Sequence, residues 1–194
     1  MSQNGGKQIV IDACVASCCS SGDIFDPHPE HSGTHCRNCL MAIAQGGHFA
    51  VFNRKLMKEW DDHASRFARH WRVEMILTEK VLQNIEGEEY SYLLECACAV
   101  LTTEKDALAN DFHLVQSALA TGQLIVSIER RFPQIVSVAS KTIVVLALLY
   151  FANPDVEGDK CIRWIRDGAE KHLKRHIDVW ARSHRRNETR PAKD

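Results

Sequence analysis

The sequence predicts an α/β fold of three layers, α/β/α, in which helices cover both faces of a central, mainly parallel sheet. Short apolar segments rich in β-branched residues alternate along the chain with segments of helical periodicity, the pattern of such sheets. The longest apolar run, Ile143 to Ala152, is shorter than the roughly 20 residues that cross a bilayer, so no membrane contact is expected. An apolar content of 45% in 194 residues indicates one domain with a substantial core.

The first strand is expected at residues 8–12, where apolar and β-branched side chains follow one another. A loop rich in Cys, Ser and Gly comes next, and Asp26-Pro27-His28-Pro29 excludes regular structure there. Thr34 is expected to cap a helix that ends at Gln45, before Gly46-Gly47. A second short strand is expected at residues 49–52.

A long helix is predicted over residues 54–71, because apolar side chains recur there at helical spacing. Further helix is expected over 73–85 and 90–100, with a break at Gly87. The predicted helix stripe places Trp60 and Trp71 in the core rather than on a base-stacking surface. Its members are Leu56, Trp60, Ala64, Phe67 and Trp71.

The second half of the chain predicts the same alternation. Asp111 is expected to open a helix that ends at Thr121-Gly122. The segments that follow are a strand over 123–128, a helix over 131–138, a strand over 143–151 and a helix over 155–182. We expect a domain over 1–152 and a helical extension with a basic tail over 153–194, packed on the same domain.

The net charge of −1 hides an asymmetry along the chain. Residues 160–194 hold 11 Lys and Arg against 5 Asp and Glu, a net +6, whereas the remainder carries −7. The basic end is either a solvated helix and tail or a contact for nucleic acid phosphate or an acidic partner. Eight cysteines and a polar N-terminal segment without a secretory signal predict reduced thiols and a cytoplasmic location.

Four carboxylates mark points where the local pattern changes: Asp12, Glu59, Asp111 and Glu129. Asp12 and Glu129 follow expected strands, so they belong at the carboxyl edge of the sheet, where functional groups gather in parallel folds. Each acid also has a structural alternative: helix capping for Asp111, a helix first turn for Glu129 and a solvated flank for Glu59. Asp12 has the weakest alternative, because an acid at a buried strand end needs a partner.

The order of these acids resembles that of PIN domains, the nuclease fold of VapC-type toxins and of a longer bacterial subgroup. The resemblance covers about residues 8–151, and Asn153-Pro154 and 164–169 extend it. Cys14 departs from the Asn or Ser that many members carry, and Glu129 departs from the commoner Asp. The matching stretches are Ile9-Val10-Ile11-Asp12-Ala13-Cys14-Val15, residues 53–60, residues 110–119 and Ile125-Val126-Ser127-Ile128-Glu129.

The resemblance implies a Rossmann-like fold and hydrolysis of RNA phosphodiester bonds with Mg²⁺ or Mn²⁺, leaving a 5′-phosphate. Asp12 and Asp111 are expected to bind the metal directly, while Glu59 and Glu129 bind it through water or hold a second ion. Ser127 and Cys14 are expected to support the site. An antitoxin protein is the implied partner, and a homodimer stays open.

Several alternatives stay open beside this interpretation. Arg54, Arg130 and Arg131, with His63, flank the acids and either hold phosphate or lie solvated. The chain is either an active endoribonuclease or a catalytically weak module of the same fold that binds RNA or protein.

A zinc site is a further alternative for the cysteines. Cys36-x-x-Cys39, with His31 and His35 nearby, resembles a zinc half-site to which Cys14, Cys18 and Cys19 would add ligands only through folding. Cys36 and Cys39 are also one helical turn apart, so packing in the core is the simpler interpretation.

Overall fold

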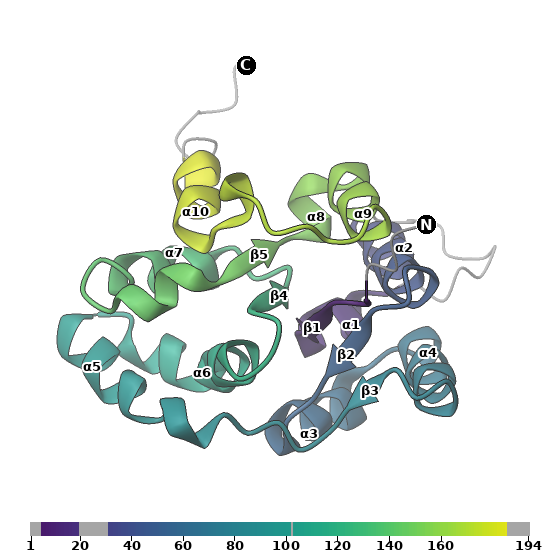
Figure 1. Ribbon diagram of the computed structural model, residues 1–194, viewed down its shortest axis with the longest axis horizontal. Coiled ribbons are helices and arrows are strands. Elements are labelled where there is room, and N and C mark those ends of the chain that lie inside the picture. The colour runs from purple at the N-terminus through teal and green to yellow at the C-terminus, as the bar shows by residue number, and fades with distance from the viewer. Residues whose placement is uncertain (1–4, 20–30, 102, 186–194) are drawn as a thin grey trace.

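The computed structural model describes residues 5–19, 31–101 and 103–185, which form a central five-stranded sheet between helices. The strand order is β3-β2-β1-β4-β5, and every neighbouring pair is parallel. All carboxyl ends of the strands therefore lie at one edge of the sheet (Figure 1). The strands are β1 (Gln8–Ile11), β2 (Phe49–Val51), β3 (Val81–Leu82), β4 (Leu124–Val126) and β5 (Tyr150–Ala152).

Helices pack on both faces of this sheet, which confirms the predicted α/β class. Helix α2 contacts α1, α4, α8 and α9, whereas α6 contacts α7 and the strands β1 and β4, and α7 contacts α10 (Figure 1). The helices are α1 (Ala13–Cys18), α2 (His31–Gln45), α3 (Arg54–His63), α4 (Arg66–Leu77), α5 (Tyr92–Val100), α6 (Lys105–Leu119), α7 (Arg131–Ala139), α8 (Pro154–Glu157), α9 (Asp159–Arg166) and α10 (Ile177–Arg185). Three short 3₁₀ helices join them: η1 (Glu88–Tyr90), η2 (Val144–Leu148) and η3 (Leu173–Arg175).

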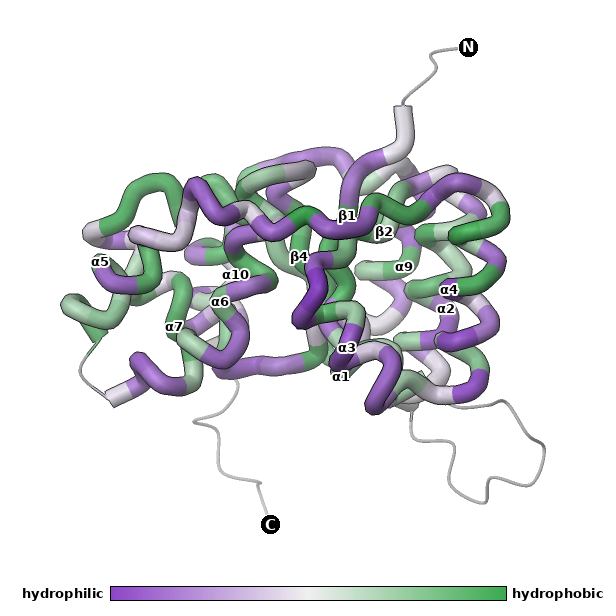
Figure 2. Tube along the Cα trace, turned by 90° about the horizontal axis from the view of Figure 1, so that it is seen from below, coloured by the Kyte–Doolittle hydropathy of each residue, from purple (hydrophilic) through white to green (hydrophobic). Residues whose placement is uncertain are grey.

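The core is continuous across the sheet and both helix layers. Strands β1 and β4 are buried on both faces, as their unbroken apolar sequences require. The helices alternate hydrophobic and hydrophilic bands instead, because each buries only one face (Figure 2). Trp60 and Trp71 are buried with ring centroids 5.9 Å apart, so the expectation that they belong to the core is confirmed.

Two helical predictions in the first half are wrong in their boundaries. The expected helix over 54–71 is broken between α3 and α4, where the Ser65 hydroxyl caps α4 and the Ser65 N–H donates to Ala16 O. The Cys/Ser/Gly-rich segment after β1, expected as a loop, begins with α1, which the Asp12 side chain caps. Helix α2 begins at His31 rather than at Thr34. Residues 26–29 lie outside the described part of the chain.

The strand β3 lies inside a stretch that was predicted as helix, residues 73–85. Helix α4 ends at Leu77, and Glu79 follows with a φ of 56°, a left-handed conformation that stops a helix. The chain then pairs with β2, with Val81 opposite Ala50. A pairing partner 31 residues away thus overrides the local helical preference. Gly87 has a φ of 63° and opens η1, in agreement with the break expected there.

The apolar run expected as one strand over 143–151 divides into two elements. Residues 144–148 form η2, and only β5 pairs with β4. Apolar periodicity does not distinguish a short buried strand from a buried helical segment, which explains the error. The final helix expected over 155–182 likewise divides into α8, α9, η3 and α10, with a turn at Gly158, whose φ is 52°.

The C-terminal helices pack on both helix layers. Helix α9 packs on α2, while α10 packs on α7 and contacts β5. His48 links α9 to the segment before β1. Its Nδ1 accepts from Lys7 N at 3.0 Å, and its Nε2 lies 2.9 Å from Ile165 O. Residues 186–194, the end of the expected basic tail, lie outside the described range. Among the helices described, none has the length and apolarity needed to cross a bilayer.

Candidate active site

Asp12 lies directly after β1 and is held in one orientation. Its Oδ2 accepts a 2.7 Å hydrogen bond from the Ser127 hydroxyl, and its Oδ1 accepts one of 3.2 Å from the Cys14 N–H. Trp60 Nε1 donates to the preceding carbonyl, Ile11 O, at 3.0 Å, so α3 is fixed against the end of β1. Both partners of the carboxylate belong to residues expected to support the site.

Cys14 and Ser127 form a small hydrogen-bonded unit beneath Asp12. The Ser127 hydroxyl uses its one hydrogen on Asp12 and accepts from Glu129 N at 3.0 Å. The Cys14 Sγ, 3.4 Å from Ser127 Oγ, is therefore the donor in that contact, while it accepts from Ile128 N. Burial, together with the Asp12 charge, raises the pKa of Cys14 well above its ordinary value, so the thiol stays protonated and can donate. Cysteine thus fulfils here a role that a hydroxyl or amide would also fulfil.

Glu59 lies half-buried on α3 and faces α6. Its Oε2 is 3.2 Å from His113 Nε2, and its Oε1 is 3.9 Å from Lys55 Nζ. The His113 Nδ1 lies 3.0 Å from Asn110 O, which fixes the ring, yet Nε2 misses hydrogen-bond geometry with Glu59. Burial lowers the pKa of His113, while Glu59 opposes that shift. Glu59 and His113 therefore lie at ion-pair distance without a hydrogen bond between them.

Asp111 is the residue on which the other acids converge. It lies half-buried in the middle of α6, which begins at Lys105, so the expectation that Asp111 opens this helix is wrong. Its pKa is raised to about 6 by burial and by the charges of Asp12, Glu59 and Glu129, against a lowering effect of Lys55. Helix capping therefore does not explain this acid, on which the charges of three other segments act.

Glu129 is the most exposed of the four acids and has the weakest effect on Asp111. Its Oε1 accepts a 3.0 Å hydrogen bond from Arg131 N, at the beginning of α7. This contact is the helix-start role that the sequence left open as its structural alternative. Glu129 therefore combines a local structural contact with a position at the carboxyl edge.

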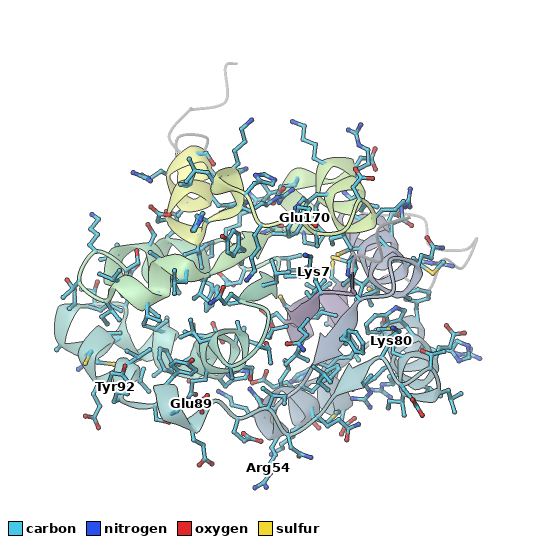
Figure 3. All side chains as sticks on the ribbon, viewed as in Figure 1. Lys7, Arg54, Lys80, Glu89, Tyr92 and Glu170 are labelled. Atoms are coloured by element: carbon cyan, nitrogen blue, oxygen red, sulfur yellow. The ribbon has the colours of Figure 1, made fainter. Side chains whose placement is uncertain are left out.

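The three arginines expected near the acids all have carboxylate partners. Arg130 Nη2 lies 2.9 Å from Asp155 Oδ2, and Arg131 Nη2 lies 3.8 Å from Glu104 Oε1. Arg54 lies at the periphery of the molecule beside Glu86, with its side chain 82% exposed (Figure 3). Solvated surface pairs describe Arg54 and Arg131 best, whereas Arg130 links the loop after β4 to α8.

Sequence reasoning missed the residues that align α3 with α6. Asn53 is buried, caps α3 by accepting from Leu56 N at 2.7 Å, and donates to His113 O and Ser117 Oγ. Lys55 donates to Asn110 O and acts on Asp111. An Asn before a helix is a recognisable cap. Its second role depends on α6, 60 residues further on, and leaves no local signal.

The donor chemistry of the acids fits a hard divalent cation. Carboxylate oxygens are the ligands that Mg²⁺ and Mn²⁺ prefer. Burial and the neighbouring carboxylates raise the pKa of Asp111, although Lys55 opposes them. In the arrangement described here, no three His, Cys, Asp or Glu side chains are placed to hold a metal ion. A bound cation would therefore require these side chains to adjust.

The zinc alternative finds no support in the described part of the chain. Cys36 and Cys39 are fully buried in the core, so their packing role is confirmed. All eight cysteines are free thiols. The side chain of His31 lies outside the described residues.

Comparisons with protein-family models, with curated proteins and with solved structures each gave no match to this chain.

Proposed function

We propose that this chain is a metal-dependent endoribonuclease that hydrolyses RNA phosphodiester bonds at the four acids. The supporting observation is that the charges of Asp12, Glu59 and Glu129 act on Asp111, and that Asp12 and Glu129 follow parallel strands that end at one edge of the sheet. Repulsion between like charges raises the free energy of such a cluster, and a bound cation would lower it. The order of the acids also resembles that of PIN domains, which motivates RNA as the substrate.

The contacts of each acid suggest its role in the proposed reaction. Asp12 is oriented by Ser127 and Cys14, as a metal ligand must be. Asp111 is the second expected ligand, and Glu59 lies behind it beside His113. A bound Mg²⁺ or Mn²⁺ would neutralise the carboxylates and the phosphate and would acidify a water molecule for attack. Cleavage of single-stranded or loop RNA to leave a 5′-phosphate follows from the resemblance.

A toxin role with an antitoxin partner is the simplest biological setting for this activity. It rests on the resemblance to VapC-type toxins alone. The expected consequence is that a partner protein covers the carboxyl edge and blocks the acids.

Cleavage of end-labelled RNA in Mn²⁺ tests the proposal. Asp111→Asn should lower the rate at least about a hundredfold, because it removes an expected metal ligand. Asp106→Asn is the matched control on the same helix, since Asp106 is exposed in its first turn and is not among the charges that shift the pKa of Asp111. The proposal fails if the wild type shows no cleavage that EDTA abolishes, or if both variants cleave alike.

A catalytically weak binding module is the second candidate. It is favoured by the absence, within the described residues, of three ligands already placed for a metal. Binding of RNA without cleavage at saturating Mn²⁺ would favour it over the nuclease.

A further inference from the structure

Two adjoining hollows follow the C-terminal helices, away from the four acids. Their volumes are about 470 and 490 Å³, and Lys160, His172 and Arg175 line both. In Figure 1 the region lies between α9 and α10, crossed by the segment that joins them. We name it the C-terminal groove; its positively charged end is lined by Lys160, His172, Lys174, Arg175, Trp180 and His184.

The groove is built on a buried ion pair. Arg175 Nη1 contacts Glu157 Oε2, and the two side chains are only 8% and 9% exposed. Glu157 Oε1 also accepts from Trp180 Nε1 at 2.8 Å and from Asn153 N at 3.0 Å. The pair thus joins α8, η3 and α10 in one arrangement, and the groove has a defined shape.

Arg175 retains donors that this pair does not use. A guanidinium has five N–H groups, and in the described part of the chain its side chain donates to Glu157 alone. The guanidinium carbon of Arg175 lies 4.3 Å from the centroid of the Trp164 ring. Arg175 is buried yet lines both hollows, so part of its side chain borders the groove. A planar oxyanion or a phosphate suits such donors.

Positive charge is in excess at the end of the groove near α10. Lys160 and Lys174 are exposed, and no carboxylate within the described residues lies at ion-pair distance from either. Glu157 is the one acid that lines this end, and Arg175 neutralises it. The other end carries Asp167 and Glu170, of which Glu170 pairs with Lys7 (Figure 3). An anion is therefore attracted to the α10 end.

Aromatic rings accompany these cations. The His184 ring stacks on Trp180 with centroids 4.1 Å apart, and Trp164 borders the neighbouring hollow. A groove that combines cations with aromatic rings is the usual means of binding single-stranded nucleic acid without sequence preference. The exposed lysines suit the phosphates. Trp180 is buried beneath His184, so of these rings only the half-buried His184 and Trp164 can meet a base.

We propose that the C-terminal groove binds the backbone of single-stranded RNA as a second contact, apart from the acids. Helix α8 connects the two regions, because Asp155 pairs with Arg130 beside Glu129, and Glu157 lies two residues further on. The choice of RNA rests on the proposed nuclease function. The positive groove itself does not depend on catalysis.

Fluorescence anisotropy of a labelled single-stranded RNA dodecamer in EDTA tests the groove without cleavage. The double variant Lys160→Glu/Lys174→Glu should weaken binding roughly tenfold, and it should lower the slope of log K against log salt by about 1.4, as expected for two lost phosphate contacts on a single strand. Arg66→Glu/Lys141→Glu changes the charge equally with exposed residues outside the groove, and it should change the affinity less than about twofold. Equal weakening by both pairs, or none by either, would overturn the groove.

Two further arms separate this proposal from the nuclease and from an acidic protein partner. Binding that the groove variant keeps, beside EDTA-sensitive cleavage by the wild type, would overturn the groove alone. Groove-dependent binding without any cleavage would overturn the nuclease alone. A polyglutamate peptide that displaces RNA at equal charge concentration would show that the groove takes acidic protein, which contradicts the proposal. Circular dichroism should be unchanged in both double variants, because all four substituted side chains are exposed.

Discussion

Glu157 and Asp111 are both shielded from solvent, but hydrogen-bond donors surround the first carboxylate whereas other carboxylates act on the second. Glu157 accepts from a guanidinium, an indole and a backbone N–H. Burial raises the pKa of Asp111 to about 6 together with the charges of three other carboxylates, and one lysine opposes this shift. The first acid is compensated within the chain, and the second is not.

This difference distinguishes a carboxylate that stabilises the fold from carboxylates that are candidates for binding a ligand. A compensated carboxylate stabilises the packing of α8, η3 and α10 and needs nothing more from outside the chain. An uncompensated cluster lowers stability, and such local costs gather at sites that bind or react. The carboxyl edge is therefore where we expect the cation of the proposed nuclease to bind.

The largest expected effect on the free energy of unfolding comes from removing Glu157, the compensated carboxylate. Glu157→Ala should lower the free energy of unfolding by about 3 kcal/mol or more, because it leaves Arg175 buried without its partner. Urea unfolding measures the loss. The double variant Glu157→Ala/Arg175→Met should recover part of it, since both charges are then gone. Asp178→Ala, which breaks the exposed pair with Arg182, should cost less than about 0.5 kcal/mol. A similar cost for both single variants would contradict the role given to Glu157.

A smaller effect of opposite sign is expected at Asp111. In metal-free protein at about pH 8, Asp111→Asn should raise the free energy of unfolding by about 1–2 kcal/mol, less than the full shift implies because solvent screens a half-buried group. The folded-state pKa of about 6 exceeds the ordinary value of 3.8, so the wild type loses stability as pH rises through this interval. Below about pH 4 the carboxyl is protonated in both states, and the advantage of Asn should disappear.

Unfolding curves at both pH values with Asp106→Asn as control check this prediction. Asp106 lies in the first turn of α6, where a negative charge is favourable, so its loss should be neutral or slightly destabilising. An Asp111→Asn variant less stable than the wild type at the higher pH would show that the carboxylate is compensated after all.

The smallest effect concerns Lys55, the cation that opposes the acids. Lys55→Met should raise the pKa of Asp111 further, by an interaction worth about 0.3–1 kcal/mol for so exposed a charge. A ¹³C titration of the Asp111 carboxyl measures it. Lys58→Met, an exposed neighbour on the same helix, should leave that pKa unchanged. An equal pKa of Asp111 in the wild type and in Lys55→Met would show that Lys55 does not act on this carboxylate.

The sequence allowed the fold class and the placement of Asp12 and Glu129 to be predicted, because both depend on local pattern and on a rule of topology. An apolar run ending in an acid indicates a strand end, and parallel strands end at one edge. The boundaries of α3 and α4 and the strand β3 escaped prediction. They depend on contacts such as Ser65 N to Ala16 O and on the pairing of Val81 with Ala50.

The same distinction holds for the site. Ser127 beside Asp12 was expected from the resemblance. Asn53 and His113 were missed, because a buried amide that joins α3 to α6 and a ring that faces Glu59 are defined by distance in space, not along the chain.

A crystal soaked in Mn²⁺ tests most directly whether the four acids form one metal site. We expect an anomalous difference peak between Asp12 and Asp111, with Glu59 and Glu129 around it. No peak at the carboxyl edge at saturating Mn²⁺, or a peak elsewhere alone, would contradict the metal-dependent nuclease.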